Sequence, residues 1–112
     1  MIRRLQVLHK LGYIHRDLKP ANITVGHGKK ANIIYLIDFG LTKKQQEDIS
    51  MNGFNPNQGH NNKMAGTPIY APINAHHGNG TCFKKDDVQS LMYVLIYLCR
   101  GFLPWQNIKC NP

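Results

Sequence analysis

The segment from Asp86 to Gly101, DDVQSLMYVLIYLCRG, is the feature that most restricts the fold of this chain. Its two acidic residues suit the start of a helix, because they face the positive end of the helix dipole. From Leu91 to Leu98 the predicted helix is apolar on nearly every side, and such a helix needs packing partners on each face. The other residues of the 112-residue chain are too few to cover every face of this helix, so we expect the chain to be the middle of a larger protein.

The composition fits one small folded domain, since 42% of the residues are apolar. The most apolar run, residues 88–99, is too short to span a bilayer, and the basic start of the chain is not followed by the apolar stretch of a signal peptide. The three cysteines, Cys82, Cys99 and Cys110, show no C-x-x-C spacing. We therefore expect a reducing location, cytoplasmic or nuclear or both.

The net charge of +8 attracts anions of many kinds, including phosphates, acidic peptides and nucleic acid. The basic residues come mostly as scattered pairs, so a solvated basic face is the default interpretation. A nucleic-acid function would rest on charge alone, and we do not expect one. A zinc site at His76, His77 and Cys82 would lack a full set of ligands.

Local patterns predict an α+β arrangement. Apolar residues recur at helical spacing over residues 1–11, and Gly12 stands where a helix would end. Residues 23–25 and 33–37 are expected to be strands on either side of a turn. Residues 41–65 lose all periodicity and predict a loop of about 25 residues, a length that is usually functional or mobile.

A polar cluster, YIHRDLKPAN, lies between the first helix and the first strand. Asp17 and Asn22 belong to it, and Asp38 follows the second strand in the sequence IDFG. Oxygen ligands of this kind suit Mg²⁺ bound with nucleotide phosphates. Asp17 could then accept a hydroxyl proton, and Lys19 could neutralise charge on a phosphoryl group.

The sequence HRDLKPAN followed by IDFG resembles the catalytic loop and metal-binding motif of eukaryotic protein kinases. Three longer segments are similar to the casein kinase 1 family, including its tau-tubulin kinase relatives: VGHGKKANIIYLIDFGLTKK, GTPIYAPINAHHG and KKDDVQSLMYVLIYLCRGFLPWQ. The likeness covers nearly the whole chain apart from residues 45–64. Either short motif alone would be more simply a surface ion-pair loop or a strand-to-turn ending.

The resemblance implies an α+β fold, namely a mainly helical kinase C-lobe fragment with a short β-hairpin at the catalytic loop and with the N-lobe absent. Residues 1–112 would then form a partial kinase domain. Its parts would be helix E (1–12), the catalytic loop (13–22), the strand hairpin with DFG (23–40), the activation segment (41–74) and helix F (86–100).

The resemblance also implies a role for each residue that matches a kinase motif. Asp17 would be the catalytic base, Lys19 would contact the transferred phosphate, and Asn22 and Asp38 would hold Mg²⁺ and the nucleotide. Arg16 would orient the activation segment, Thr67 would support Asp17 and Lys19, and Asp87 would brace the catalytic loop. His15, Phe39 and Gly40 would give structural support.

The implied activity is that of a serine/threonine protein kinase, with ATP, Mg²⁺ and protein substrates, and with no membrane or nucleic-acid partner. Because the glycine-rich loop and strand lysine that cover ATP would be absent, we expect little or no turnover by the 112-residue chain. Ile69 stands where the casein kinase 1 family usually has an arginine, which makes a preference for pre-phosphorylated substrates doubtful. The alternative is a non-catalytic binding module or pseudokinase fragment, and the oligomeric state stays open.

Overall fold

The structure is a computed structural model that describes residues 1–45, 64–77 and 83–108. Most of the predicted 41–65 loop lies outside these residues, as do Cys82 and Cys110 of the cysteines considered above. The predicted activation segment (41–74) is therefore described only at its two ends.

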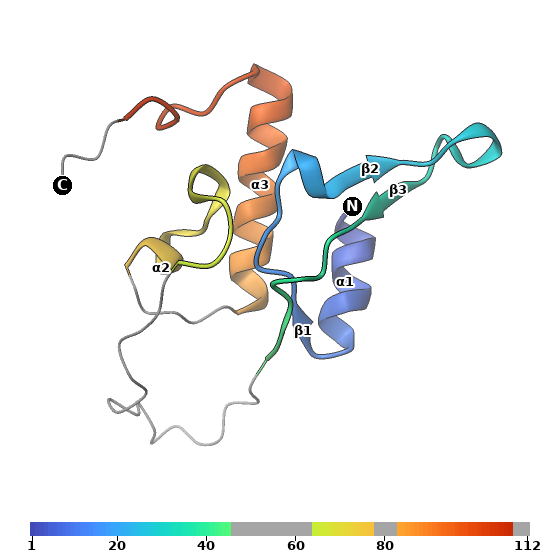
Figure 1. The fold of residues 1–112 in the computed structure, drawn as a ribbon, viewed down its shortest axis with the longest axis horizontal. Coiled ribbons are helices and arrows are strands. Elements are labelled where there is room, and N and C mark those ends of the chain that lie inside the picture. The colour runs from blue at the N-terminus through green and yellow to red at the C-terminus, as the bar shows by residue number, and fades with distance from the viewer. Residues whose placement is uncertain (46–63, 78–82, 109–112) are drawn as a thin grey trace.

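The described residues form three helices and two small antiparallel sheets, which confirms the predicted α+β class. The helices are α1 (Ile2–Lys10), α2 (Ile73–His76) and α3 (Lys84–Arg100). The strands are β1 (Tyr13–Ile14), β2 (Ile23–Val25), β3 (Ile34–Leu36) and β4 (Lys43–Lys44). Short 3-10 turns lie at Pro20–Asn22 (η1), Gly28–Lys30 (η2) and Pro68–Tyr70 (η3). Figure 1 shows α3 in the middle, with α1 and the β2–β3 hairpin on one side and residues 64–77 on the other.

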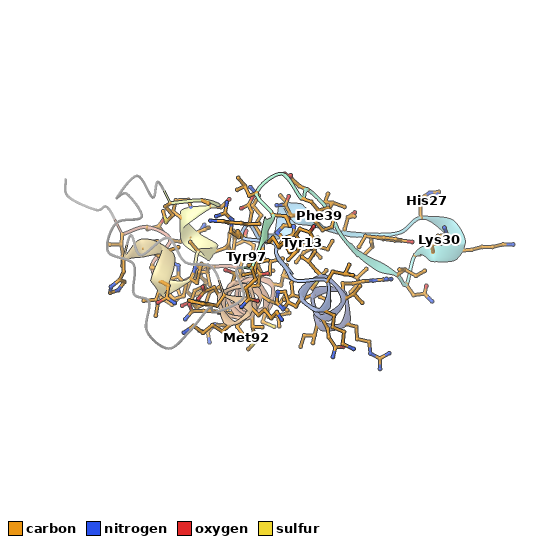
Figure 2. All side chains as sticks on the ribbon, turned by 90° about the horizontal axis from the view of Figure 1, so that it is seen from below. Tyr13, His27, Lys30, Phe39, Met92 and Tyr97 are labelled. Carbon is orange, nitrogen blue, oxygen red and sulfur yellow. The ribbon has the colours of Figure 1, made fainter. Side chains whose placement is uncertain are left out.

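Strands β2 and β3 pair in the hairpin that their β-branched residues predict, with Thr24 opposite Tyr35. Beyond the last pair, the Ile37 amide donates to the Asn22 carbonyl at 3.0 Å. The hairpin projects away from the helices (Figure 1), and Figure 2 shows His27 and Lys30 at its far tip. Its base, by contrast, joins the end of the polar cluster to the residues just before Asp38.

The second sheet was not predicted from the sequence. In it β1 pairs with β4, with Tyr13 opposite Lys44 and Ile14 opposite Lys43. The Gln45 amide extends the pairing by donating to the Gly12 carbonyl at 2.7 Å. The chain that leaves Asp38 to Gly40 therefore turns back alongside the residues that lead into the polar cluster.

Helix α3 begins two residues earlier than the acidic pair indicates. Its N-cap is Phe83, and Asp86 reaches back so that its carboxylate accepts the Phe83 amide at 2.7 Å. Asp86 thus satisfies the helix start, and its neighbour Asp87 is free for another contact. The helix ends at Gly101, whose φ of 78° is the left-handed conformation that glycine adopts most readily.

Two apolar clusters hold α3 against the other elements. In the first, Leu91 of α3 packs with Leu5 of α1 and Leu18 of the polar cluster. In the second, Val94 packs with Tyr70 and Leu103, and the partly buried Ile23 contacts both clusters. Burial, and after it the neighbouring Tyr97, raises the pKa of the Tyr70 hydroxyl above its ordinary value of 10.0.

The rest of α3 carries apolar side chains at the surface, among them Val88, Met92, Leu95 and Ile96. Figure 2 shows Met92 directed away from the labelled Phe39 and Tyr13. No helix within the described ranges is both long enough and apolar enough to cross a membrane.

Adjacent residues of α3 provide a direct test of this packing. Leu91 is 2% exposed and Met92 is 49% exposed. Leu91→Ala should lower the free energy of unfolding by about 2–5 kcal/mol, because it leaves a cavity where α1, α3 and the polar cluster meet. Met92→Ala, the control, should change it by no more than about 0.5 kcal/mol. Denaturant unfolding measures both, and equal losses would contradict the assigned core.

Candidate active site

The carboxylate of Asp17 is the most densely bonded group of the polar cluster. One carboxylate oxygen accepts the amide and the hydroxyl of Thr67 at 3.1 and 3.2 Å. The other accepts the Asn22 side-chain amide at 3.2 Å and lies 3.2 Å from the Lys19 ammonium. The side chain is buried, at 9% exposed, so these donors fix its orientation almost completely.

Lys19 and Thr67 complete a triangle with Asp17. The Lys19 ammonium donates to the Thr67 hydroxyl at 2.9 Å, while that hydroxyl donates to Asp17. Thr67 comes from a segment far along the chain, and Gly66 is what lets this segment approach. Gly66 has a φ of 95°, and a Cβ there would lie 2.6 Å from the Arg16 carbonyl. A larger residue at position 66 would therefore push Thr67 away from Asp17.

His15 connects the polar cluster to the strand that leads to Asp38. Its Nδ1 accepts the Asp17 amide at 3.2 Å, so the ring proton is on Nε2, which donates to the Ile37 carbonyl at 3.1 Å. The ring also packs edge to face with Phe39, with centroids 5.5 Å apart. His15 is fully buried, and this arrangement fixes the position of Ile37 relative to Asp17.

Asn22 and Asp38 are brought close by the backbone. The carbonyl of Asn22 accepts the amide of Ile37, the residue directly before Asp38. The side-chain amide nitrogen of Asn22 donates to the Asp17 carbonyl at 2.8 Å as well as to its carboxylate, which leaves the amide oxygen as the atom able to bind a cation. Asp38 is exposed and in the left-handed region at φ 60°, with one carboxylate oxygen accepting the Gly40 amide at 3.1 Å.

This pair fits a magnesium ion. An amide oxygen and a carboxylate are hard oxygen ligands, and Mg²⁺ commonly takes one or two protein carboxylates and completes its shell with water and phosphate oxygens. Among the residues that the structure describes, no group of three or more His, Cys, Asp or Glu could hold a metal ion.

Arg16 is the second residue of the site with an unusual backbone. Its φ is 71°, and its side chain donates from Nε to the Leu41 carbonyl at 2.7 Å. A left-handed conformation is unfavourable for a long side chain and persists only where surrounding contacts enforce it. Here the contact to Leu41 joins the polar cluster to the chain that follows Gly40.

Asp87 supplies the contact that enforces this backbone. One of its carboxylate oxygens accepts the His15 amide at 2.8 Å and the His9 Nε2 at 2.7 Å. The other accepts the Arg16 amide at 3.0 Å. Asp87 is 2% exposed, so α3 presents a buried carboxylate to two successive backbone amides of the polar cluster.

The structure thus brings most of the residues chosen from the sequence into one contiguous set. Asp17, Lys19, Asn22 and Thr67 bond to one another directly, and His15 and Asp87 join them to the strands and to α3. Sequence reasoning missed His9 and Gly66. His9 could have been noticed because it lies one helical turn after the buried Leu5, on the face that packs inward.

The three bonds to Asp87 predict a sharp loss of stability when its charge is removed. Asp87→Asn keeps the side-chain shape but has one oxygen where two now accept, so at least one buried donor loses its partner. We expect the free energy of unfolding to fall by roughly 1–3 kcal/mol. The control is Asp38→Asn at an exposed position, where asparagine also tolerates the left-handed backbone, and its effect should stay within about 0.5 kcal/mol. Denaturant titration decides, and equal stabilities of the Asp87→Asn variant and the wild type would refute the bracing role.

Comparison with known families agrees with this geometry. The family model for the protein kinase domain matches residues 1–112. Protein kinases are transferases that generally use ATP and Mg²⁺ and act on protein substrates. The match extends over the loop with Asp17 and Asn22, the strand end with Asp38 and the helix with Asp87, and on this basis the chain belongs to the protein kinase family.

Proposed function

We propose that this protein is a serine/threonine kinase of the casein kinase 1 type, transferring the γ-phosphoryl group of ATP to protein hydroxyls. The observation that carries the proposal is the direct bonding of Asp17 to Lys19, Asn22 and Thr67. A lysine two residues after the aspartate is typical of the serine/threonine class rather than the tyrosine class. The three casein kinase 1-like segments support the narrower assignment.

The described elements fit the parts of a kinase C-lobe, and we assign them accordingly. Helix α1 would be helix E, residues 13–22 the catalytic loop, residues 23–40 the hairpin with DFG, and α3 helix F. Residues 41–74 would be the activation segment. The odd number of cysteines leads us to propose a cytoplasmic or nuclear location.

In the proposed reaction, the oxygen of a substrate serine or threonine attacks the γ-phosphorus and the bond to the β-phosphate oxygen breaks, so that ADP leaves. Asp17 accepts the hydroxyl proton as the new bond forms. Lys19, 3.2 Å from the same carboxylate, faces the transferred phosphoryl group with a positive charge. The Thr67 hydroxyl bonds to the side chains of both Asp17 and Lys19. Arg16 would hold the start of the activation segment through its hydrogen bond to the Leu41 carbonyl.

Asn22 and Asp38 would hold the magnesium ion, and the hydrogen bond between the Asn22 carbonyl and the Ile37 amide fixes their backbones side by side. The ion, when bound, neutralises and orients the nucleotide phosphates. His15 and Phe39 keep this strand end in place through their ring contact, and the Gly40 amide fixes the Asp38 carboxylate. Ile69 in place of the usual arginine gives no support to a preference for pre-phosphorylated substrates.

Magnesium–ATP binding tests the proposed metal site without requiring turnover. Asp38→Asn should weaken magnesium-dependent ATP binding on the order of tenfold or more, because it removes the exposed carboxylate ligand while keeping the backbone conformation. Isothermal calorimetry with and without Mg²⁺ measures the effect. Lys30→Ala at the hairpin tip is the control and should bind like the wild type. Identical affinities for Asp38→Asn and the wild type would exclude Asp38 as a ligand.

A second prediction concerns catalysis. In the full-length protein, Asp17→Asn should lower kcat by about 10²–10⁴, because the carboxylate that accepts the proton is lost. Magnesium–ATP affinity should change little, since Asp17 is not among the proposed ligands. Phosphate transfer to a serine or threonine peptide measures the rate. Undiminished transfer would remove Asp17 from the mechanism.

Partner binding that survives Asp17→Ala together with Asp38→Ala, in a protein without kinase activity, would favour the non-catalytic module instead.

A further inference from the structure

Two aromatic side chains of helix α3 pack against aromatic residues from other segments beside the site. Tyr93 and Tyr97 are one helical turn apart and therefore lie on one face of the helix. Tyr93 packs edge to face with Trp105, with ring centroids 4.8 Å apart, and Tyr97 packs likewise with Tyr70 at 5.7 Å. Tyr93 thus contacts Trp105 in the segment that follows α3, and Tyr97, one helical turn later, contacts Tyr70 of η3.

Trp105 makes a further contact that joins these two segments. Its indole nitrogen donates to the carbonyl of Ile69 at 2.7 Å, across 36 positions of the chain. The bond reaches the backbone, so it does not depend on which side chain position 69 carries. The Ile69 side chain itself packs against the cluster of Tyr70, Val94 and Leu103. Both the carbonyl and the side chain of Ile69 are therefore held from the side of α3.

The same short turn is held to Asp17 at its other end. Thr67 precedes η3 and bonds to Asp17 and Lys19. Within the turn, the Tyr70 amide donates to the Thr67 carbonyl at 3.1 Å, and Pro68 restricts the backbone further. The bonds of Thr67 to Asp17 and Lys19 keep Thr67 itself in place, and the position of Ile69 relative to Asp17 is set by this short turn together with the Trp105 contact.

We propose that Trp105 is a positioning residue for the peptide substrate, acting by holding the Ile69 carbonyl. The inference rests on the proposed kinase function. Thr67 bonds to Asp17, and a peptide extends by about 3.3–3.6 Å per residue, so Pro68 and Ile69 lie within reach of a residue next to a hydroxyl bound at Asp17. Pro68 is exposed and Ile69 is half-buried, so this turn presents surface to such a neighbour. Trp105 fixes that surface relative to Asp17 without touching the reacting atoms.

Trp105→Phe separates the hydrogen bond from the ring packing, because phenylalanine keeps a ring against Tyr93 and has no donor. In the full-length protein, the peptide KM should rise by roughly two- to tenfold, the range expected for losing one hydrogen bond, while the ATP KM and kcat stay within about twofold. Tyr93→Phe is the matched control, since it keeps both the ring contact and the Trp105 donor. Its peptide KM should equal that of the wild type.

Amide hydrogen exchange gives a second readout that needs no activity. Trp105→Phe should speed exchange at Tyr70 and Ala71, whose amides close η3, and should leave α1 unchanged. If the wild type is active and Trp105→Phe keeps the wild-type peptide KM, the inference alone is overturned. It is also overturned if Trp105→Phe loses kcat equally for all peptides and its amides exchange faster throughout the described chain. Absence of phosphoryl transfer by the wild type would instead overturn the proposed function, and this inference with it.

Discussion

The buried carboxylate of Asp87 is the contact on which the site depends. It accepts the amides of His15 and Arg16, two successive donors that no helix or sheet of the described chain satisfies, together with the His9 ring. A buried amide without a partner is costly, so these bonds specify where the loop lies on α3. Once His15 is fixed, its ring determines the position of Ile37, and Asp38 comes next in the chain. The helix therefore positions both ends of the candidate site through one side chain.

Two non-glycine residues of the site have left-handed backbones, and each is held by its own nearby contacts. Arg16 and Asp38, at φ 71° and 60°, stand at the two turns that face the site. Such conformations cost on the order of 1–3 kcal/mol each and must be compensated nearby. For Arg16 the compensation is the Asp87 carboxylate and the Leu41 carbonyl, and for Asp38 it is the turn closed by the Gly40 amide. Arg16, Asp38, Asp87 and Gly40 all belong to the set that the resemblance to protein kinases implied, whereas the Leu41 carbonyl was not among the expected residues.

The predictable features are those that repeat along the chain or follow from residue chemistry. The apolar run of α3 and the β-branched residues of the hairpin have their own periodicity, and oxygen side chains at strand and loop ends indicate a metal–phosphate site. The β1–β4 sheet has no such signal, because Lys43 and Lys44 carry no apolar alternation and pair only through backbone placed by the rest of the fold. The resemblance implied the bracing role of Asp87, but the capping contact of Asp86 was not predicted, since it depends on Phe83 being the N-cap of α3.

The distribution of negative charge adds a constraint that composition conceals. In a chain of net charge +8, the described carboxylates are Asp17, Asp38, Asp86 and Asp87, and all but Asp38 are buried and matched by specific donors. Asp38 is therefore the one exposed carboxylate among the described residues. Phosphates are attracted by the net positive charge, whereas a divalent cation has this one exposed carboxylate to approach. A cation bound there would in turn draw phosphate oxygens to Asp38 and, through the backbone pairing of Ile37 with Asn22, towards Asp17. In the proposed kinase function, the basic residues would attract the nucleotide phosphates and Asp38 would help to bind the metal ion that orders them.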